Sequence, residues 1–159
     1  MEGSHAAIEP FFLDRPRLGD LLLRKGLITP ENLSDALVES RASEELLGRV
    51  LIRLGYVFED ELARTLAEQL KLPYVNLQVL GVDRLVARML PAAAGRRAAA
   101  IPVALLGDRV RVAFADPCDP TAHAIVQQYI PLIELAVGEL SDIESAWRRV
   151  EGEAGAGEG

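Results

Sequence analysis

The sequence predicts an α+β fold: an N-terminal helical lobe of two tandem helix-turn-helix units, followed by a small α+β lobe with a short sheet. Two observations carry this prediction. A helical pattern occurs twice near the N-terminus, and alternating apolar residues flank a turn further along the chain. We therefore expect a flexible leader at 1–14, the helical lobe at 15–70, the α+β lobe at 71–150 and a disordered tail at 151–159.

Length and composition limit the classes of function. The chain has 159 residues, of which 50% are hydrophobic and 26% charged, as in an ordinary globular protein. Its formal net charge of -7 disfavours binding to nucleic acid. No apolar run reaches the roughly 18 to 20 residues of a transmembrane helix, so direct membrane insertion is not expected. A single cysteine and two histidines provide neither a disulfide nor a zinc site, which indicates a cytoplasmic chain without a metal.

The helical pattern of residues 17–40 returns in residues 46–69 at a constant offset of 29 residues. Each copy opens with apolar residues at helical spacing and reaches a glycine, Gly26 or Gly55, of the kind that ends helices in the left-handed conformation. A longer helix follows, with Thr29 as its cap in the first copy. Because such units cannot bury their apolar sides alone, we expect the two copies to pack on each other.

Gly19 and Gly48 lie at the entrance of the two short helices. A residue without Cβ leaves backbone N–H groups open to an anion or a ring. It also allows a neighbouring helix to pack closely. On the residues alone, close packing is the favoured explanation.

The second lobe contains a hairpin, predicted by alternating valines on both sides of Gly107-Asp108. Its last helix is predicted to start at Ser141, with Glu144 at the capping-box position. The expected elements are an extended linker at 72–77, helices at 83–89 and 91–98, strands at 101–106 and 109–115, a helix at 122–129, a strand at 131–137 and a helix at 141–150.

The chain lacks the residues of a recognisable catalytic site. No GxxxxGK[ST] loop is present to bind the phosphates of ATP. Cys118 and His123 lie five residues apart, but nothing in the spacing supplies an acid to orient the imidazole. Asp116 precedes a proline, as turn-forming and capping residues do, and we also consider that it projects towards the first lobe and accepts hydrogen bonds from a ligand. We expect a binding or docking module and no enzyme.

The doubled pattern RLGxxLLxxGLLxxxxLxxxLxxQ, with residues 41–45 between the copies, resembles the N-terminal, MshEN-like domain of the type II secretion and type IV pilus assembly ATPases. Residues 72–74 (LPY), 101–102 (IP) and 110–119 (VRVAFADPCD) are similar to the rest of that domain. The resemblance spans about residues 15–150 and does not include the ATPase motor. It implies a non-catalytic regulatory module.

In one branch of that family the tandem motif binds cyclic di-GMP, so the resemblance implies this dinucleotide as the ligand, with no cofactor. Leucines would contact the guanines, and arginine, glutamine and aspartate would bind the polar edges. The candidate ligand-binding residues are Arg17, Leu18, Gly19, Leu33, Leu37, Ser40, Leu47, Gly48, Arg49, Leu62, Leu66, Gln69 and Asp116.

Two positions depart from the family pattern. Ser40 stands where the glutamine of the first copy belongs, and Leu46 replaces the arginine of the second copy, which removes a guanidinium that would bind phosphate. Arg49 occupies a place where an acid is usual, close enough to Leu46 to substitute for it in part. The alternative is therefore a docking module that has lost nucleotide binding. Its partner would be a secretion or pilus ATPase or an inner-membrane platform protein.

Overall fold

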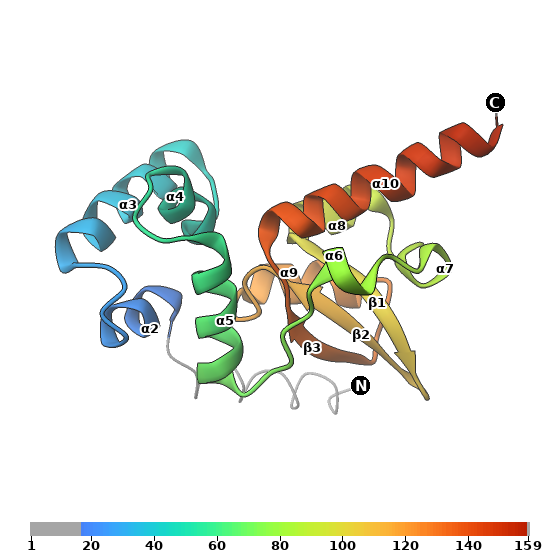
Figure 1. Ribbon diagram of the computed structural model, residues 1–159, viewed down its shortest axis with the longest axis horizontal. Helices are drawn as coiled ribbons and strands as arrows, with labels where there is room; N and C mark the ends of the chain where they lie inside the picture. Colours follow the sequence, from blue (N-terminus) through green and yellow to red (C-terminus); the bar gives the residue numbers. More distant parts are fainter. Residues whose placement is uncertain (1–16, 159) are drawn as a thin grey trace.

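The computed structural model describes residues 17–158, so the leader expected at 1–14 lies outside the described residues. Helices α2 (Leu18–Arg24), α3 (Pro30–Ser43), α4 (Leu47–Arg53) and α5 (Glu59–Leu70) form an N-terminal repeat lobe. A lobe of short helices around a small sheet follows, and α5 stands between the other repeat helices and this sheet (Figure 1). The predicted α+β class is confirmed.

Each short repeat helix ends at its glycine, as the sequence predicts. Gly26 and Gly55 have φ values of +73° and +78°, in the left-handed region that favours glycine. The N–H of Leu27 donates to the carbonyl of Leu22 (3.0 Å), and the second copy repeats this pairing between equivalent residues. These bonds satisfy carbonyl groups that the end of a helix would otherwise leave unpaired.

The longer helices begin differently in the two copies. In α3, Thr29 and Asn32 form a reciprocal capping box, with N–H to side-chain distances of 3.0 and 3.1 Å. In α5, Phe58 holds the capping position and makes no side-chain cap. Three acidic residues in the first turn, beginning with Glu59, favour this helix start through its dipole.

Gly19 and Gly48 are close-packing positions. A Cβ on Gly19 would lie 2.8 Å from Leu33 Cδ1, and one on Gly48 would lie 3.3 Å from Leu62 Cδ2. In each copy the glycine thus meets the leucine fourteen positions later, at the start of the longer helix. Close packing explains why both short helices have glycine as their second residue.

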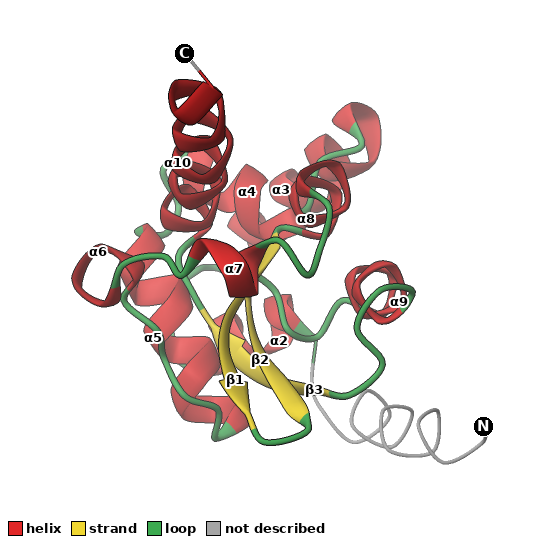
Figure 2. Cartoon of the chain, turned by 90° about the vertical axis from the view of Figure 1, so that its right-hand side faces the viewer, coloured by secondary structure: helices red, strands yellow, loops and turns green. Residues whose placement is uncertain are grey.

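The sheet has three strands in the order β1-β2-β3: β1 (Ala100–Leu106), β2 (Arg109–Phe114) and β3 (Ile133–Val137) (Figure 2). Strands β1 and β2 form the expected antiparallel hairpin, with Gly107 at φ +66° in the turn. Strand β3 runs parallel to β2, and helix α9 (Pro120–Gln127) makes the crossover between them.

The linker after α5 joins the free edge of β3. The N–H of Val75 donates to the carbonyl of Val137 (2.8 Å), and the N–H of Val137 donates to the carbonyl of Pro73 (2.9 Å). Val137 itself is fully buried and packs within the apolar cluster of the repeat lobe. The end of β3 is therefore attached to both lobes.

Three short helices follow the linker: α6 (Leu77–Leu80), α7 (Arg84–Ala87) and α8 (Ala92–Ala98). The sequence predicts the last two but not α6. Asn76 caps α6 by accepting hydrogen bonds from the N–H groups of Gln78 and Val79. A helix of four residues is too short to show a 3.6-residue period, so only its cap marks it.

The last helix, α10 (Leu140–Glu158), differs from the prediction at both ends. Ser141 lies inside its first turn instead of capping it: the N–H and hydroxyl of Ser141 bind the carboxylate of Glu59, and Glu144 pairs with Arg49. The helix also continues beyond the expected end and covers most of the segment 151–159 for which disorder was predicted. Extending an existing helix needs no new nucleation, and the alanines and glutamates of residues 151–158 offset the three glycines there.

None of the helices within 17–158 is long and apolar enough to cross a membrane.

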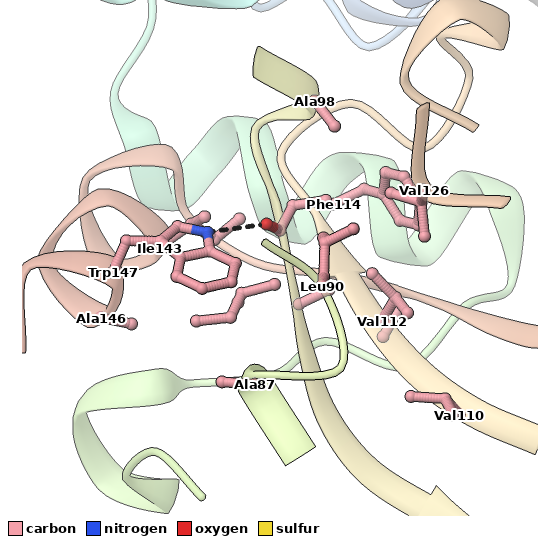
Figure 3. Packing of buried hydrophobic residues seen from close by; sticks show 14 of the residues in the cluster. Ala87, Leu90, Ala98, Val110, Val112, Phe114, Val126, Ile143, Ala146 and Trp147 are labelled. Atoms are coloured by element: carbon pink, nitrogen blue, oxygen red, sulfur yellow. Dashed lines mark hydrogen bonds between the residues drawn. The ribbon is translucent and has the colours of Figure 1, made fainter. Parts of the chain in front are cut away.

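The core of the second lobe centres on Trp147 of α10 (Figure 3). Its indole N–H donates to the carbonyl of Ala100 (2.8 Å), and its ring is almost completely buried. The ring lies against the backbone of α8 at Gly95, where an added Cβ would be 2.2 Å from Trp147 Cζ2. This contact fixes α10 on the sheet.

We predict that Gly95→Ala lowers the free energy of unfolding by about 2 kcal/mol, roughly 4 to 8 °C in Tm, because the buried Trp147 ring cannot move aside. Thermal unfolding followed by circular dichroism measures this. Gly152→Ala is the matched control, since no atom lies within 4 Å of a Cβ there. A Gly95→Ala Tm equal to that of the wild type would contradict the packing argument.

Candidate functional site

A cleft of about 540 Å³ lies between the two lobes. This volume is within the range of small-molecule sites in proteins. The starts of the two repeats and the junction between them line one wall, and the segment that follows β2 lines the other. The lining residues are Arg17, Leu18, Gly19, Ser40, Glu45, Leu46, Leu47, Asp116, Cys118, Asp119 and Pro120.

A narrow crevice of about 20 Å³ lies beside this cleft, at the second repeat. It has room for about one water molecule. Leu46 and Asp116 line both spaces, so the cleft and the crevice adjoin. The other crevice residues are Gly48, Arg49, Ile52, Glu59, Leu62, Ala63, Ala115, Gly138, Glu139 and Leu140.

Strand direction explains how the second lobe supplies these walls. Strands β2 and β3 are parallel, and Phe114 pairs with Val137 at their ends. The chain therefore leaves both strands at the same edge of the sheet, where residues 115–116 and 138–139 face the repeat lobe. The crevice at the carboxyl ends of parallel strands is the usual ligand position in open α/β sheets.

Asp116 is the acidic residue common to both spaces. Its carboxylate accepts a hydrogen bond from the N–H of Cys118 (3.0 Å), which folds the chain into a turn across Pro117. Burial raises the pKa of Asp116 to about 6, and Asp119 adds to this rise, while the bond from Cys118 opposes it. At neutral pH the carboxylate is mostly ionised and can accept further hydrogen bonds.

His123 supports the turn that carries Asp116. Its Nε2 donates to the carbonyl of Pro117 (2.7 Å), and its ring centroid lies 4.9 Å from that of Phe114. Burial lowers the pKa of His123, which favours its neutral form. The side chain thus holds residues 116–118 against the sheet.

Ser40 binds backbone at the junction of the two repeats. Its hydroxyl donates to the carbonyl of Glu45 (2.5 Å). The carboxylate of Glu45 accepts from Arg53 (2.7 Å), and this hydrogen bond lowers the pKa of Glu45. Glu45 lines the cleft although the sequence reasoning did not select it; its place directly before the second copy was the available signal.

The second repeat is joined to the first turn of α10 by two polar contacts. Arg49 Nη2 lies 2.6 Å from Glu144 Oε2. The N–H of Ser141 donates to Glu59 (3.2 Å), and its hydroxyl binds the same carboxylate. Sequence reasoning missed Glu59 as part of the site because its partner is 82 residues away.

The linker adds a third contact to the same helix start. The hydroxyl of Tyr74 donates to Glu139 (2.5 Å), and the Arg64 guanidinium lies 4.6 Å from the centroid of the Tyr74 ring. Burial, followed by the bond to Glu139, raises the pKa of Tyr74 to about 12. Tyr74 therefore remains a donor at neutral pH.

The predicted residues separate into three groups. The cleft brings together Arg17, Leu18, Gly19, Ser40, Leu47 and Asp116. The crevice brings Gly48, Arg49 and Leu62 to Asp116. Leu33, Leu37, Leu66 and Gln69 line neither space, and Leu66 is fully buried in the repeat lobe. Within the described part of the chain, no group of three or more His, Cys, Asp or Glu side chains is placed to hold a metal ion.

Comparison with known proteins identifies relatives of this arrangement. The MshEN domain matches residues 70–157, more than half of the chain. The type IV pilus assembly ATPase PilB of Thermus thermophilus is 38% identical over 102 residues, which are 64% of this chain and 11% of PilB. PilB of Myxococcus xanthus is 30% identical over 101 residues, which are 64% of this chain and 18% of that protein. The chain thus spans less than a fifth of these relatives.

Solved structures extend the similarity to both lobes. A structure of MshE with cdg (cyclic di-GMP) superimposes with a TM-score of 0.68 at 32% identity and covers 86% of this chain and 99% of that one. The N-terminal domain of XpsE superimposes with a TM-score of 0.68 at 29% identity, covering 84% and 92%. The chain belongs to the MshEN domain family.

Proposed function

We propose that this chain is a non-catalytic regulatory module of the secretion and pilus ATPase N-terminal type, and that it binds cyclic di-GMP in the cleft between its lobes. The observation that carries the proposal is the cleft itself. It has a volume of about 540 Å³, with the start of the first repeat on one side and Asp116 on the other. The similarity to MshE, which was solved with cdg, supports this ligand. The similarity to ATPase N-terminal domains supports a module without chemistry of its own.

The cleft walls suit the chemistry of this ligand. Arg17 supplies a guanidinium, which binds phosphate through paired hydrogen bonds. Leu18 and Leu47 supply apolar surface for a guanine ring. The ionised carboxylate of Asp116 accepts hydrogen bonds, and the amino group of guanine donates them.

The charges of the cleft also orient the ligand. Asp116 and Asp119 line the wall after β2, opposite the guanidinium of Arg17, while Glu45 is paired with Arg53. Phosphates are repelled by the acidic wall and attracted to Arg17. We infer that a phosphate binds at the entrance of α2 and that a base edge binds at the turn after β2.

A protein-docking module is the second candidate function, for a type II secretion or type IV pilus machine. It is favoured by three large apolar side chains on α6 and α7, which are 63% to 84% exposed: Val79, Leu80 and Leu85. Figure 2 shows these helices on the side turned away from the repeat lobe. The partner would be a secretion or pilus ATPase or an inner-membrane platform protein. Absence of heat at high concentrations of cyclic di-GMP would reject nucleotide binding, and a pull-down that recovers no component of such a machine would count against docking.

We predict micromolar binding of cyclic di-GMP and a Kd about tenfold or more higher in Arg17→Ala, because a charged hydrogen bond to phosphate is lost. Isothermal titration calorimetry measures both constants. Arg24→Ala is the control, since it removes the same charge from the other end of α2. An equal loss of affinity in Arg24→Ala would mean that general charge, and not the cleft, governs binding.

We predict that Leu46→Arg lowers the Kd for cyclic di-GMP by about tenfold, because it adds a guanidinium where the cleft meets the crevice. The same titration tests this gain. Leu54→Arg places the identical substitution at the partly exposed other end of α4 and should leave the Kd unchanged. Weaker binding in Leu46→Arg would contradict a phosphate position at this junction.

We predict that affinity falls with pH below about 6. The pKa of Asp116 is about 6 in the free protein, and only the ionised form offers two acceptor oxygens to the N–H donors of the guanine edge. The Kd should be constant above about pH 7 and rise by up to tenfold for each pH unit below 6. In Asp116→Asn binding should be weaker at pH 8 and show no such pH dependence. A parallel pH profile in that variant would exclude Asp116 as the titrating group.

A further inference from the structure

The second repeat borders the open cleft through Leu46 and Leu47, and its Gly48 and Arg49 line the narrow crevice beside it. This crevice of about 20 Å³ holds about one water molecule, far less than a base or a phosphate needs. Two contacts from the second repeat to α10 close it: the ion pair of Arg49 with Glu144 (2.6 Å) and the binding of Ser141 by Glu59. A ligand that enters here must displace at least the ion pair.

The two repeats carry their cations at different positions. The first has Arg17 at its opening and Asp20, an exposed acid, three positions later. The second has Leu46 and Arg49 at the equivalent positions. The guanidinium has therefore moved by about one helical turn, and both Leu46 and Arg49 still line the crevice.

The ion pair is of a kind that a ligand can exchange. The side chains of Arg49 and Glu144 are 36% and 33% exposed, and ion pairs near the surface contribute little net stability. A phosphate offers the guanidinium two oxygens in place of the single oxygen that Glu144 presents. The exchange thus replaces one charged contact with a stronger one.

We propose that Arg49 is the phosphate-binding residue of the second repeat and that Glu144 holds it until a ligand takes its place. Ligand entry exchanges the Arg49–Glu144 pair for an Arg49–phosphate pair and separates α4 from the first turn of α10. This inference rests on the proposed function. It assigns a cation to the half of the dinucleotide at the second repeat, where Leu46 supplies no charge.

A double-mutant cycle tests this, with cyclic di-GMP as the probe in calorimetry. Glu144→Gln should bind about fivefold more tightly than the wild type, because Arg49 no longer has a competing carboxylate. Arg49→Ala should bind about tenfold more weakly. The gain from Glu144→Gln should disappear when Arg49 is already alanine, since the two residues act through one contact.

Glu134→Gln is the matched control, because Glu134 forms a comparable pair with Arg111 (2.6 Å) on the sheet and carries the same charge. Equal tightening in Glu134→Gln, or a gain from Glu144→Gln that persists without Arg49, would overturn the inference. Weaker binding in Arg17→Ala together with unchanged binding in Glu144→Gln and Arg49→Ala rejects this inference alone. Absence of binding by both the wild type and Glu144→Gln rejects it together with the proposed function.

Discussion

The attachment of the end of β3 to both lobes is the constraint on which the site depends. Val137 is a residue of the sheet by its backbone pairing, yet its side chain is buried in the apolar cluster of the repeat lobe. The next residues, Gly138 to Leu140, line the crevice and start α10. The burial of Val137 in the repeat lobe thus fixes the position at which the two lobes meet. It also places the backbone of residues 138–140 against the repeats.

The parallel pairing of β2 and β3 turns this attachment into a site. Both strands end at the same edge of the sheet, where Phe114 pairs with Val137. Asp116, two residues after Phe114, therefore also lies at the boundary between the lobes. His123 holds its turn in place through the carbonyl of Pro117. The resulting burial keeps the pKa of Asp116 near 6. An acidic side chain in that environment is ionised at neutral pH but is poorly solvated, so it favours a ligand that donates hydrogen bonds.

Several features set by neighbouring residues were predictable from the sequence, and the contacts set by distant partners were not. Gly26, Thr29 and the turn at Gly107 act within a few residues of chain, and the structure has each as expected. Ser141 and Glu144 have the spacing of a capping box, but they bind Glu59 and Arg49, 82 and 95 residues away. The spacing of residues along one helix contains no information about partners so far away in the sequence. For the same reason the sequence identified the repeats as candidate walls without showing that Gly48 and Arg49 of the second copy line a narrow crevice beside the open cleft.

The repeats share a scaffold but differ in what their polar residues do. Each glycine packs on the leucine fourteen positions later, so the helix geometry is alike in both copies. The cation, however, stands at the opening in one copy and a turn further along in the other. At the later position it meets the helix that continues from β3, and it pairs with Glu144. Between the copies Arg becomes Leu at the opening and Asp becomes Arg three positions later, so each copy keeps one cation at these two positions while the helix geometry is unchanged. In the second copy the guanidinium therefore pairs with a carboxylate of α10, beside the narrow crevice.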